Sequence, residues 1–307
     1  MSSASRPVVS VVVPTRGRPD LLPQTLDSIA GQDLAGEIEC IVVHDEPTIT
    51  TPVSAMWSGD LHVREMTNRR ASGLAGARNT GILAAQADLV AFCDDDDTWD
   101  PRKLRLQTEA LDRTGALVIS CANTVHFAGR RNIRRAPAEF VTFQDLLRSR
   151  VAVLHSSTIL ARREAIVERI GLIDEAIPRG ASEDYEWQLR ASRVAPIAVV
   201  DEPLVDVLWH ERSLYAANWS VYVGGLEYIL DRYPEFDQCR RGKARLQGQI
   251  AFGYAAMRDS RTARRWVSRC LRHDWRQPRA YMAMLVSMRL LPPPLVMSQL
   301  HRRGRSM

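Results

Sequence analysis

The sequence predicts an α/β fold, in which a mixed, mainly parallel sheet is flanked by helices and a helical extension follows at the C-terminus. Three observations predict it: short apolar runs recur at residues 8–13, 39–43 and 88–93, helical periodicity separates them, and polar residues follow each run directly. Unbroken apolar strands of this length are typical of parallel sheets that are buried on both faces. Polar side chains that follow such strands lie at the sheet edge where α/β proteins bind ligands.

The remaining elements are predicted by the same periodicities in chain order. The first strand ends at Pro14, and apolar residues at Leu22, Leu26 and Ile29 then indicate a helix. Further along we expect strands at 39–43 and 61–65, an alanine-rich helix at 73–87, a strand at 88–93, a helix at 101–111, a strand at 116–120, a basic loop at 130–135, a strand at 156–161, a helix at 183–192 and a short strand at 197–200.

The last third of the chain differs in pattern and in charge. Helical periodicity predominates from residue 215, with candidate helices at 244–257, 262–271 and 278–290, so we expect an α/β domain over 1–214 and a basic α-helical extension over 215–307. From Gln238 onward there are 16 Lys and Arg against two acids, a balance of +14, whereas the whole chain carries +5. Such a surface can attract anionic lipid, nucleic acid or an acidic protein, and we expect peripheral membrane contact, with no nucleic acid partner. Arg289 and three prolines interrupt the apolar segment 280–300, which favours surface contact over a membrane span.

Composition and cysteine usage exclude several classes of protein. With 307 residues, 45% hydrophobic and 25% charged, the chain is neither disordered, nor collagen-like, nor a disulfide scaffold. Its five cysteines form no CxxC pair, which argues against structural zinc and for a reducing compartment. The first residues lack the long apolar stretch of a secretory signal, so we expect a cytoplasmic protein, at most peripheral to the inner face of the membrane, that can form a homodimer.

The sharpest chemical feature is the run of four aspartates at residues 94–97, directly after a predicted strand. Adjacent carboxylates repel one another unless a cation neutralises them, and oxygen ligands favour Mg²⁺ or Mn²⁺. Such ions commonly bridge to diphosphate oxygens, so a nucleotide ligand is expected. A solvated acidic turn is the alternative. The spacing Asp94-x-Asp96-x-Thr98 also fits the start of haloacid-dehalogenase-type phosphatases, but Lys103 lies too close and Lys243 precedes no carboxylate pair, as that class would need.

Five motifs occur together in order: VSVVVPTRGR, IVVHDEP, GLAGARNTGI, AFCDDDDTW and SEDYEWQLR. In this order and spacing the chain resembles the family 2 glycosyltransferases over residues 8–213. The resemblance implies a GT-A fold, a Rossmann-like nucleotide-binding α/β domain. A P-loop motif, GxxxxGK[ST], is absent from the sequence.

The resemblance also implies which residues hold the nucleotide. Three residues resemble the loop against the base and ribose: Pro14, Thr15 and Arg16. Asp45 resembles the aspartate that accepts a hydrogen bond from the base, although His44 replaces the aspartate that usually precedes it. Arg78 resembles the arginine that faces the donor nucleotide, and its alternative interpretation is a surface arginine on a helix.

The aspartate run fits the family's DxD motif through Asp94 and Asp96. The resemblance makes Asp96 the direct ligand of Mn²⁺ or Mg²⁺ and places Asp94 or Asp95 nearer the ribose. His210 stands where several family members have a histidine near the metal or the diphosphate, and it is our second candidate metal ligand. A purely structural histidine is the alternative.

Asp184 matches the catalytic aspartate of the family, the base that would take the proton from an acceptor hydroxyl. Its neighbours Glu183 and Trp187 are candidates for polar support and for an acceptor-facing aromatic, and His155 is a candidate for the acceptor pocket. The alternative interpretation is structural: Ser182 would cap a helix, and acids in its first turn would interact with the helix dipole.

Taken together, these features predict a metal-dependent, inverting glycosyltransferase that moves a sugar from a UDP- or dTDP-sugar to a hydroxyl of a glycan, glycolipid or small-molecule acceptor. Two alternatives remain. One is a GT-A-fold binding or scaffold protein that has lost turnover. The other is a sugar nucleotidyltransferase, whose glycine-rich loop is poorly imitated by residues 15–18.

Overall fold

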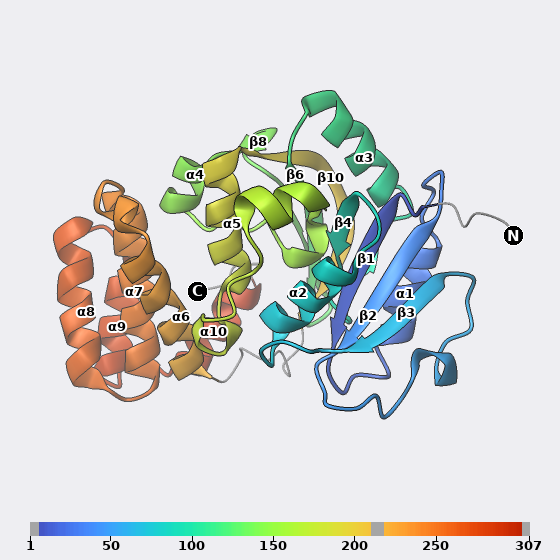
Figure 1. The fold of residues 1–307 in the computed structure, drawn as a ribbon. Coiled ribbons are helices and arrows are strands. Elements are labelled where there is room, and N and C mark those ends of the chain that lie inside the picture. Colours follow the sequence, from blue (N-terminus) through green and yellow to red (C-terminus); the bar gives the residue numbers. More distant parts are fainter. Residues whose placement is uncertain (1–5, 210–217, 303–307) are drawn as a thin grey trace, which may run out of the picture.

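The computed structural model describes residues 6–209 and 218–302, and within these ranges the chain forms a ten-stranded mixed sheet with helices on both faces and a helical layer at one end (Figure 1). The main strand order is β3-β2-β1-β4-β9-β6-β10-β5, with β7 paired to β6 and β8 to β10. Pairing is parallel for β1 with β2 and β4, for β2 with β3, and for β6 with β10. The α/β fold that the sequence predicts is confirmed.

The strands have the following bounds: β1 Val9–Thr15, β2 Ile38–His44, β3 His62–Thr67, β4 Leu89–Phe92, β5 Thr98–Trp99, β6 Val118–Phe127, β7 Arg130–Arg134, β8 Phe140–Val141, β9 Leu160–Arg162 and β10 Ile197–Leu208. The α-helices are α1 Leu22–Ala30, α2 Leu74–Ala84, α3 Lys103–Thr114, α4 Phe143–Arg148, α5 Glu183–Val194, α6 Trp219–Arg232, α7 Arg240–Ala256, α8 Ser260–His273, α9 Pro278–Ser287 and α10 Pro293–Arg302.

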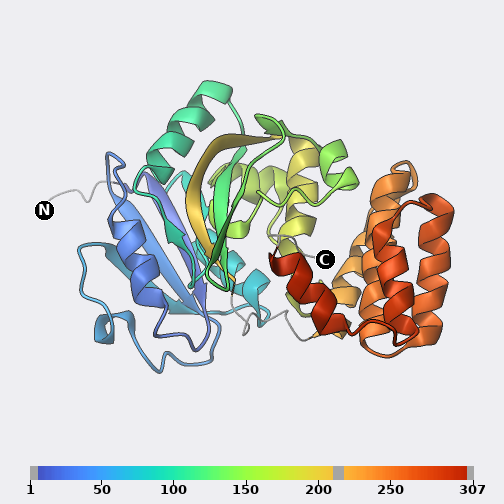
Figure 2. The same cartoon turned by 180° about the vertical axis from the view of Figure 1, so that it is seen from behind.

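Both faces of the sheet are buried because successive residues of its central strands point to opposite sides. Val12 of β1 packs into the same hydrophobic cluster as Ile82 of α2, whereas Val11 and Val13 join the cluster that contains Leu26 of α1. Helices α1 and α2 accordingly cover opposite faces, as the two views from front and back show (Figures 1 and 2). This burial explains why the strands read as unbroken apolar runs in the sequence.

Several predicted elements are wrong in type or extent, among them the strand expected at 116–120, which is observed as β6 and continues to Phe127. Residues 130–135, expected as a basic loop, form strand β7, which pairs antiparallel with β6. Residues 156–161, expected as one strand, divide into a 3₁₀ turn, Ser156–Thr158, and the short strand β9. The strand expected at 197–200 is only the beginning of β10, which continues to Leu208.

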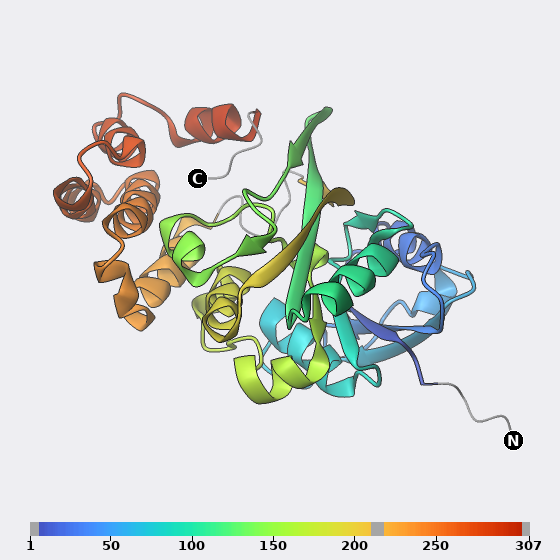
Figure 3. The ribbon, with the colours of Figure 1, turned by 90° about the horizontal axis from the view of Figure 1, so that it is seen from above.

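Helix α6 lies against the α/β core, α7 to α9 lie farther from it, and α10 turns back toward it (Figures 2 and 3). Val223 and Leu226 of α6 belong to the same hydrophobic cluster as Leu189 of α5. Helices α7, α8 and α9 pack on one another around a third cluster, which includes Ala251, Val267 and Ala283. None of the helices in the described residues is both long enough and apolar enough to cross a membrane.

Candidate active site

The four aspartates alternate between exposed and buried positions. The side chains of Asp94 and Asp96 are 21% and 15% exposed, whereas those of Asp95 and Asp97 are 7% and 1% exposed. The segment follows β4 at the carboxyl edge of the sheet, where β1 also ends. The two carboxylates of the DxD pattern are therefore the less buried members of the run.

Asp95 joins the aspartate segment to the loop after β1. Thr15 Oγ1 donates a hydrogen bond of 2.7 Å to its carboxylate, and Arg18 Nη1 donates to it at 3.2 Å and to Asp96 at 2.7 Å. Burial raises the pKa of Asp95 to about 6, against the lowering effect of these two partners. These contacts hold the loop after β1 against the aspartate segment, and the position of Asp95 near a ribose stays a prediction.

Asp97 is held inside the molecule by two donors. Ser157 Oγ donates to one carboxylate oxygen at 2.5 Å and the Leu208 N–H to the other at 3.1 Å. Burial, together with the charges of Asp94 and Asp96, raises the pKa of Asp97 well above its usual value. A carboxylate oxygen of Asp97, one of Asp94 and a ring nitrogen of His155 also form a group whose candidate ligand atoms lie within 4.8 Å of one another.

At the end of β2, the carboxylate of Asp45 is bound by the segment that leads into α2. Asn68 Nδ2 donates to it at 2.7 Å and the Gly73 N–H at 2.9 Å, while Arg16 Nη1 approaches at 3.4 Å. Pro14 and Thr15 are the last two residues of the adjacent strand β1. The residues predicted to hold the nucleotide base and ribose therefore lie side by side at the carboxyl edge of the sheet.

Arg78 on α2 connects the two halves of the predicted site. Its Nη2 donates to Asp94 at 2.5 Å and its Nη1 to Glu183 at 2.7 Å, and the side chain is only 2% exposed. The alternative interpretation, a surface arginine, is wrong. Burial would raise the pKa of Asp94, but Arg78 and His155 more than offset it and hold that pKa below the usual value.

Asp184 lies in the first turn of α5, opposite Arg150. Arg150 Nη2 donates to one of its carboxylate oxygens, and the Tyr185 N–H donates to the other at 2.8 Å. Burial would raise the pKa of Asp184, but Arg150 and His155 hold it below its usual value. The capping role suggested for Ser182 is wrong, because this residue has φ 68° and its side chain makes no capping hydrogen bond.

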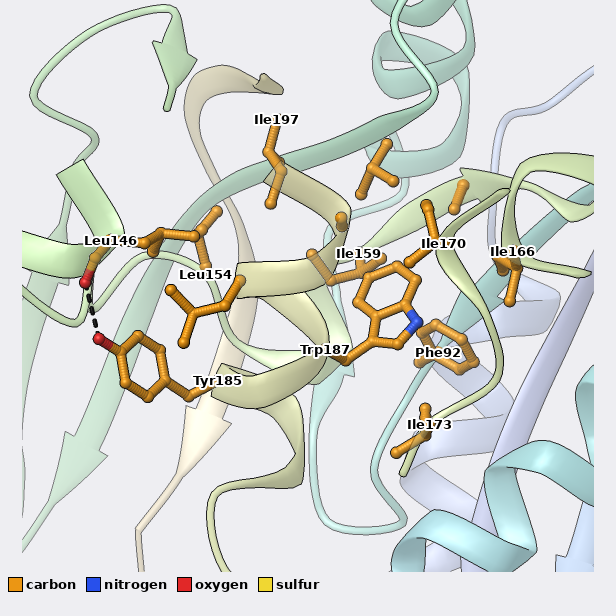
Figure 4. Packing of buried hydrophobic residues seen from close by; sticks show 14 of the residues in the cluster. Phe92, Leu146, Leu154, Ile159, Ile166, Ile170, Ile173, Tyr185, Trp187 and Ile197 are labelled. Atoms are coloured by element: carbon orange, nitrogen blue, oxygen red, sulfur yellow. Dashed lines mark hydrogen bonds between the residues drawn. The ribbon is translucent and has the colours of Figure 1, made fainter. Parts of the chain in front are cut away.

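Helix α5 is positioned by apolar packing on the sheet. Trp187 meets Phe92 of β4 edge to face, with ring centroids 6.3 Å apart (Figure 4). Trp187 Nε1 donates a hydrogen bond to the Gly171 carbonyl. A small hollow of about 20 Å³ beside these rings is lined by Arg78, Phe92, Ser156, Ile159, Ile173, Asp184, Trp187 and Gln188. Trp187 is 3% exposed, so in this geometry its ring supports the helix from within.

The residues brought together carry more negative than positive charge. Six carboxylates, those of residues 94–97, 183 and 184, meet three guanidinium groups, those of residues 18, 78 and 150. This excess of hard oxygen donors suits Mg²⁺ or Mn²⁺. Asp94 and Asp96 are the partly exposed members and are our candidates to hold the ion.

The sequence analysis did not predict two arginines of the site, Arg18 and Arg150. Arg18 lies in the motif VSVVVPTRGR, two residues after Arg16, so a signal was present. Nothing near Arg150 in the sequence indicates a role. His155, predicted as a candidate for the acceptor pocket, has its Nδ1 3.4 Å from a carboxylate oxygen of Asp97, and its role toward an acceptor stays a prediction. His210 lies outside the described residues.

Comparisons with known proteins agree with this geometry. The family profile described as "Glycosyl transferase family 2" matches residues 10–170. The succinoglycan biosynthesis protein ExoO of Rhizobium meliloti is 33% identical over 221 residues, which make up 67% of this chain and 62% of that protein. The chain thus spans somewhat less than two thirds of that relative's length.

Among solved structures, S. aureus TarS 1-349 in complex with UDP-GlcNAc superposes with a TM-score of 0.62 at 18% identity, covering 97% of this chain and 92% of that one. The mannosyltransferase PcManGT from Pyrobaculum calidifontis, in complex with GDP-Man and Mn²⁺, gives 0.55 at 17% identity over 97% and 85%. These two similarities establish the GT-A-type fold. With the family profile matching more than half of its length, the chain belongs to glycosyl transferase family 2 and is a glycosyltransferase.

Proposed function

We propose that this glycosyltransferase is metal-dependent and inverting, and that it transfers a sugar from a UDP- or dTDP-sugar to a hydroxyl acceptor. The observation that carries the proposal is the double contact of Arg78, whose one guanidinium group reaches both Asp94 and Glu183. Arg78 thereby joins Asp94, proposed to serve the donor, to Glu183, the residue next to Asp184, which is proposed to serve the acceptor.

Asp94 and Asp96 would hold Mn²⁺ or Mg²⁺, which when bound supplies positive charge to the departing diphosphate. The other donor contacts come from the chain itself. Arg78 and Arg18 lie beside these aspartates and add donors for phosphate oxygens, while Asp45 and the end of β1 are proposed to position the base and ribose.

Asp184 is proposed to accept the proton of the acceptor hydroxyl as that oxygen forms its bond to the anomeric carbon. The electron pair of the broken C–O bond leaves with the nucleoside diphosphate. A base on the acceptor side, opposite the leaving group, produces inversion at the anomeric carbon. Proton transfer by a positioned carboxylate typically contributes a factor of ~10² to 10⁴ in rate.

The structure constrains the identity of the donor's nucleotide base less than it constrains the class of reaction. TarS is solved with UDP-GlcNAc and PcManGT with GDP-Man, so one fold accepts more than one base. We favour uridine or thymidine diphosphate because Asp45, at the end of β2, resembles the aspartate that accepts from a base imide, and its oxygens are already positioned by Asn68 and Gly73.

The experiment is a thermal-shift titration with UDP, dTDP and GDP, each with and without Mn²⁺. A ligand that binds only the folded state raises Tm. At a ligand concentration of 100 times Kd it increases the free energy of unfolding by about 2.7 kcal/mol. We expect a rise with UDP or dTDP that requires the metal and is lost in Asp96→Asn. The matched control is Asp60→Asn, which changes an exposed aspartate in the loop before β3.

A metal-independent shift, or no shift with any nucleotide, would remove the support for this function. The two alternatives give different outcomes. An inactive scaffold protein would bind the nucleotide but release none from any nucleotide sugar. A nucleotidyltransferase would instead require a nucleoside triphosphate and a sugar phosphate.

A further inference from the structure

The proposed base is not available in the structure as it stands. Asp184 is 15% exposed in its side chain and is engaged by Arg150, which is 38% exposed. A carboxylate that accepts a charge-assisted hydrogen bond is a weaker base than one without such a partner. Turnover therefore requires that something draw Arg150 away from Asp184 when the acceptor arrives.

A second arginine lies in the same region. Arg134, at the end of β7, places its guanidinium carbon 4.5 Å from the ring centroid of Trp209, and its Nη1 is 3.5 Å from the carbonyl of Ala152, two residues after Arg150. Burial and, as a smaller cause, the charge of Arg150 together lower the pKa of Arg134 to about 10. Arg134 thus contacts the backbone two residues after Arg150, so both arginines belong to one short region in which an anion would be stabilised.

The approach to this pair is also basic. Strand β7 and the residue after it contain Arg130, Arg131, Arg134 and Arg135, of which all but Arg134 are exposed. Arg135 is paired with Asp201 on the neighbouring strand β10. A cluster of one sign of charge beside a site raises the local concentration of ligands of the opposite sign.

We propose that Arg134 and Arg150 form a subsite for a phosphate group on the acceptor, so that the enzyme prefers acceptors whose reacting hydroxyl lies near a phosphate monoester or diester. The inference rests on the proposed function. When the phosphate binds, Arg150 exchanges its contact with Asp184 for one with the phosphate. Asp184 is then free to take the hydroxyl proton, while the acceptor oxygen bonds to the anomeric carbon and the diphosphate leaves with the electron pair.

The first test measures binding with inorganic phosphate as the probe. The donor site is first saturated with UDP and Mg²⁺, and phosphate is then titrated while Tm is followed. We expect saturable stabilisation of the wild type and an affinity about 10- to 100-fold weaker in Arg134→Gln and in Arg150→Gln, since hydrogen bonds to charged groups contribute about that much. The control, Arg169→Gln, changes an exposed arginine on the segment Ala165–Ile170 and should bind like wild type.

No saturable effect of phosphate, or equal affinity in all four proteins, overturns the proposal. A response that is unsaturable and insensitive to these arginines would indicate an ionic-strength effect only. The nucleotide titration is independent of this result: failure of UDP to bind removes the proposed function, whereas failure of phosphate to bind removes only the subsite.

The second test measures activity with matched acceptors, each sugar being offered with and without a phosphate monoester. We expect kcat/KM to favour the phosphorylated member at least ~10-fold in the wild type, and this ratio to fall to about 1 in Arg134→Gln. Release of UDP to water is recorded in parallel as the readout of the donor site alone. Equal kcat/KM within each pair, or an unchanged ratio in Arg134→Gln, contradicts the proposal.

Discussion

Glu183 begins α5 beside Asp184, and its buried side chain connects the pH dependence of stability to the site. Burial and the neighbouring charge of Asp184 raise its pKa to about 7 from the ordinary 4.5, despite the contact with Arg78. Between pH 4.5 and 7 the folded state therefore binds more protons at this residue than the unfolded state does. Because stability falls with pH wherever the folded state binds more protons, this residue lowers the free energy of unfolding as pH rises through that window.

Glu183→Gln removes this titration while keeping an acceptor oxygen for Arg78. We expect the free energy of unfolding of the wild type, relative to the variant, to decrease by roughly 1–3 kcal/mol from pH 4.5 to pH 7. Urea unfolding across that range measures it. Glu168→Gln, at an exposed position, is the matched control. Parallel pH profiles for wild type and Glu183→Gln would show that Glu183 does not titrate there.

At the scale of single residues, the sequence predicted the acids of the site but not most of their partners. The aspartate run is a local signal, because adjacent like charges after a strand need an explanation. Arg78 was also predicted, from a motif. Arg150 lies 34 positions before Asp184, and only the folding of α4 and α5 brings them together. Pairs of that kind leave no trace in spacing or composition.

Helix α6 packs closely on the segment that leads into α5, and glycine makes this possible. A Cβ at Gly225 would lie 2.1 Å from the Ala181 carbonyl oxygen, whereas one at Gly224 would lie 3.4 Å from the Cβ of Pro178. The backbone of α6 is therefore against the residues that immediately precede Glu183 and Asp184. An added methyl group must displace one of these backbones or the other.

Gly225→Ala is expected to lower the free energy of unfolding by about 1–3 kcal/mol through overpacking, and to reduce transfer by shifting the start of α5. Gly224→Ala is the control, since both substitutions carry the same gain in helix propensity of about 1 kcal/mol. Urea unfolding and the rate of UDP release from the donor sugar compare them. If Gly225→Ala is as stable and as active as Gly224→Ala, the close contact has no bearing on the site.

At the scale of elements, unbroken apolar runs predicted the strands most reliably. Strands β1, β2 and β4 were predicted within two residues at each end because both of their faces are buried. Strand β7 was missed because its arginines, most of them exposed, conceal the strand period, and its hydrogen bonds to β6 decide its conformation. The 3₁₀ turn Ser156–Thr158 depends on side-chain contacts to Asp94 and Asp97, which are distant in sequence.

Over the whole molecule, the α/β sheet and the first C-terminal helix share one hydrophobic cluster, so the helices from α6 onward are joined to the enzyme's core through apolar contacts.

Peripheral membrane contact by the basic extension stays a prediction. It is consistent with several large apolar side chains that are exposed there beside arginines: Trp275, Tyr281, Leu285, Met288, Leu290 and Leu295.

The central claim is that donor and acceptor chemistry are divided between the aspartate segment after β4 and Asp184 on α5. The most direct measurement is transfer and donor binding by Asp184→Asn, with Asp112→Asn, a surface aspartate paired with Arg162, as control. We predict that Asp184→Asn keeps the metal-dependent rise in Tm with UDP and loses ~10² to 10⁴ in kcat. Transfer at the wild-type rate, or loss of donor binding together with transfer, would contradict this division of roles.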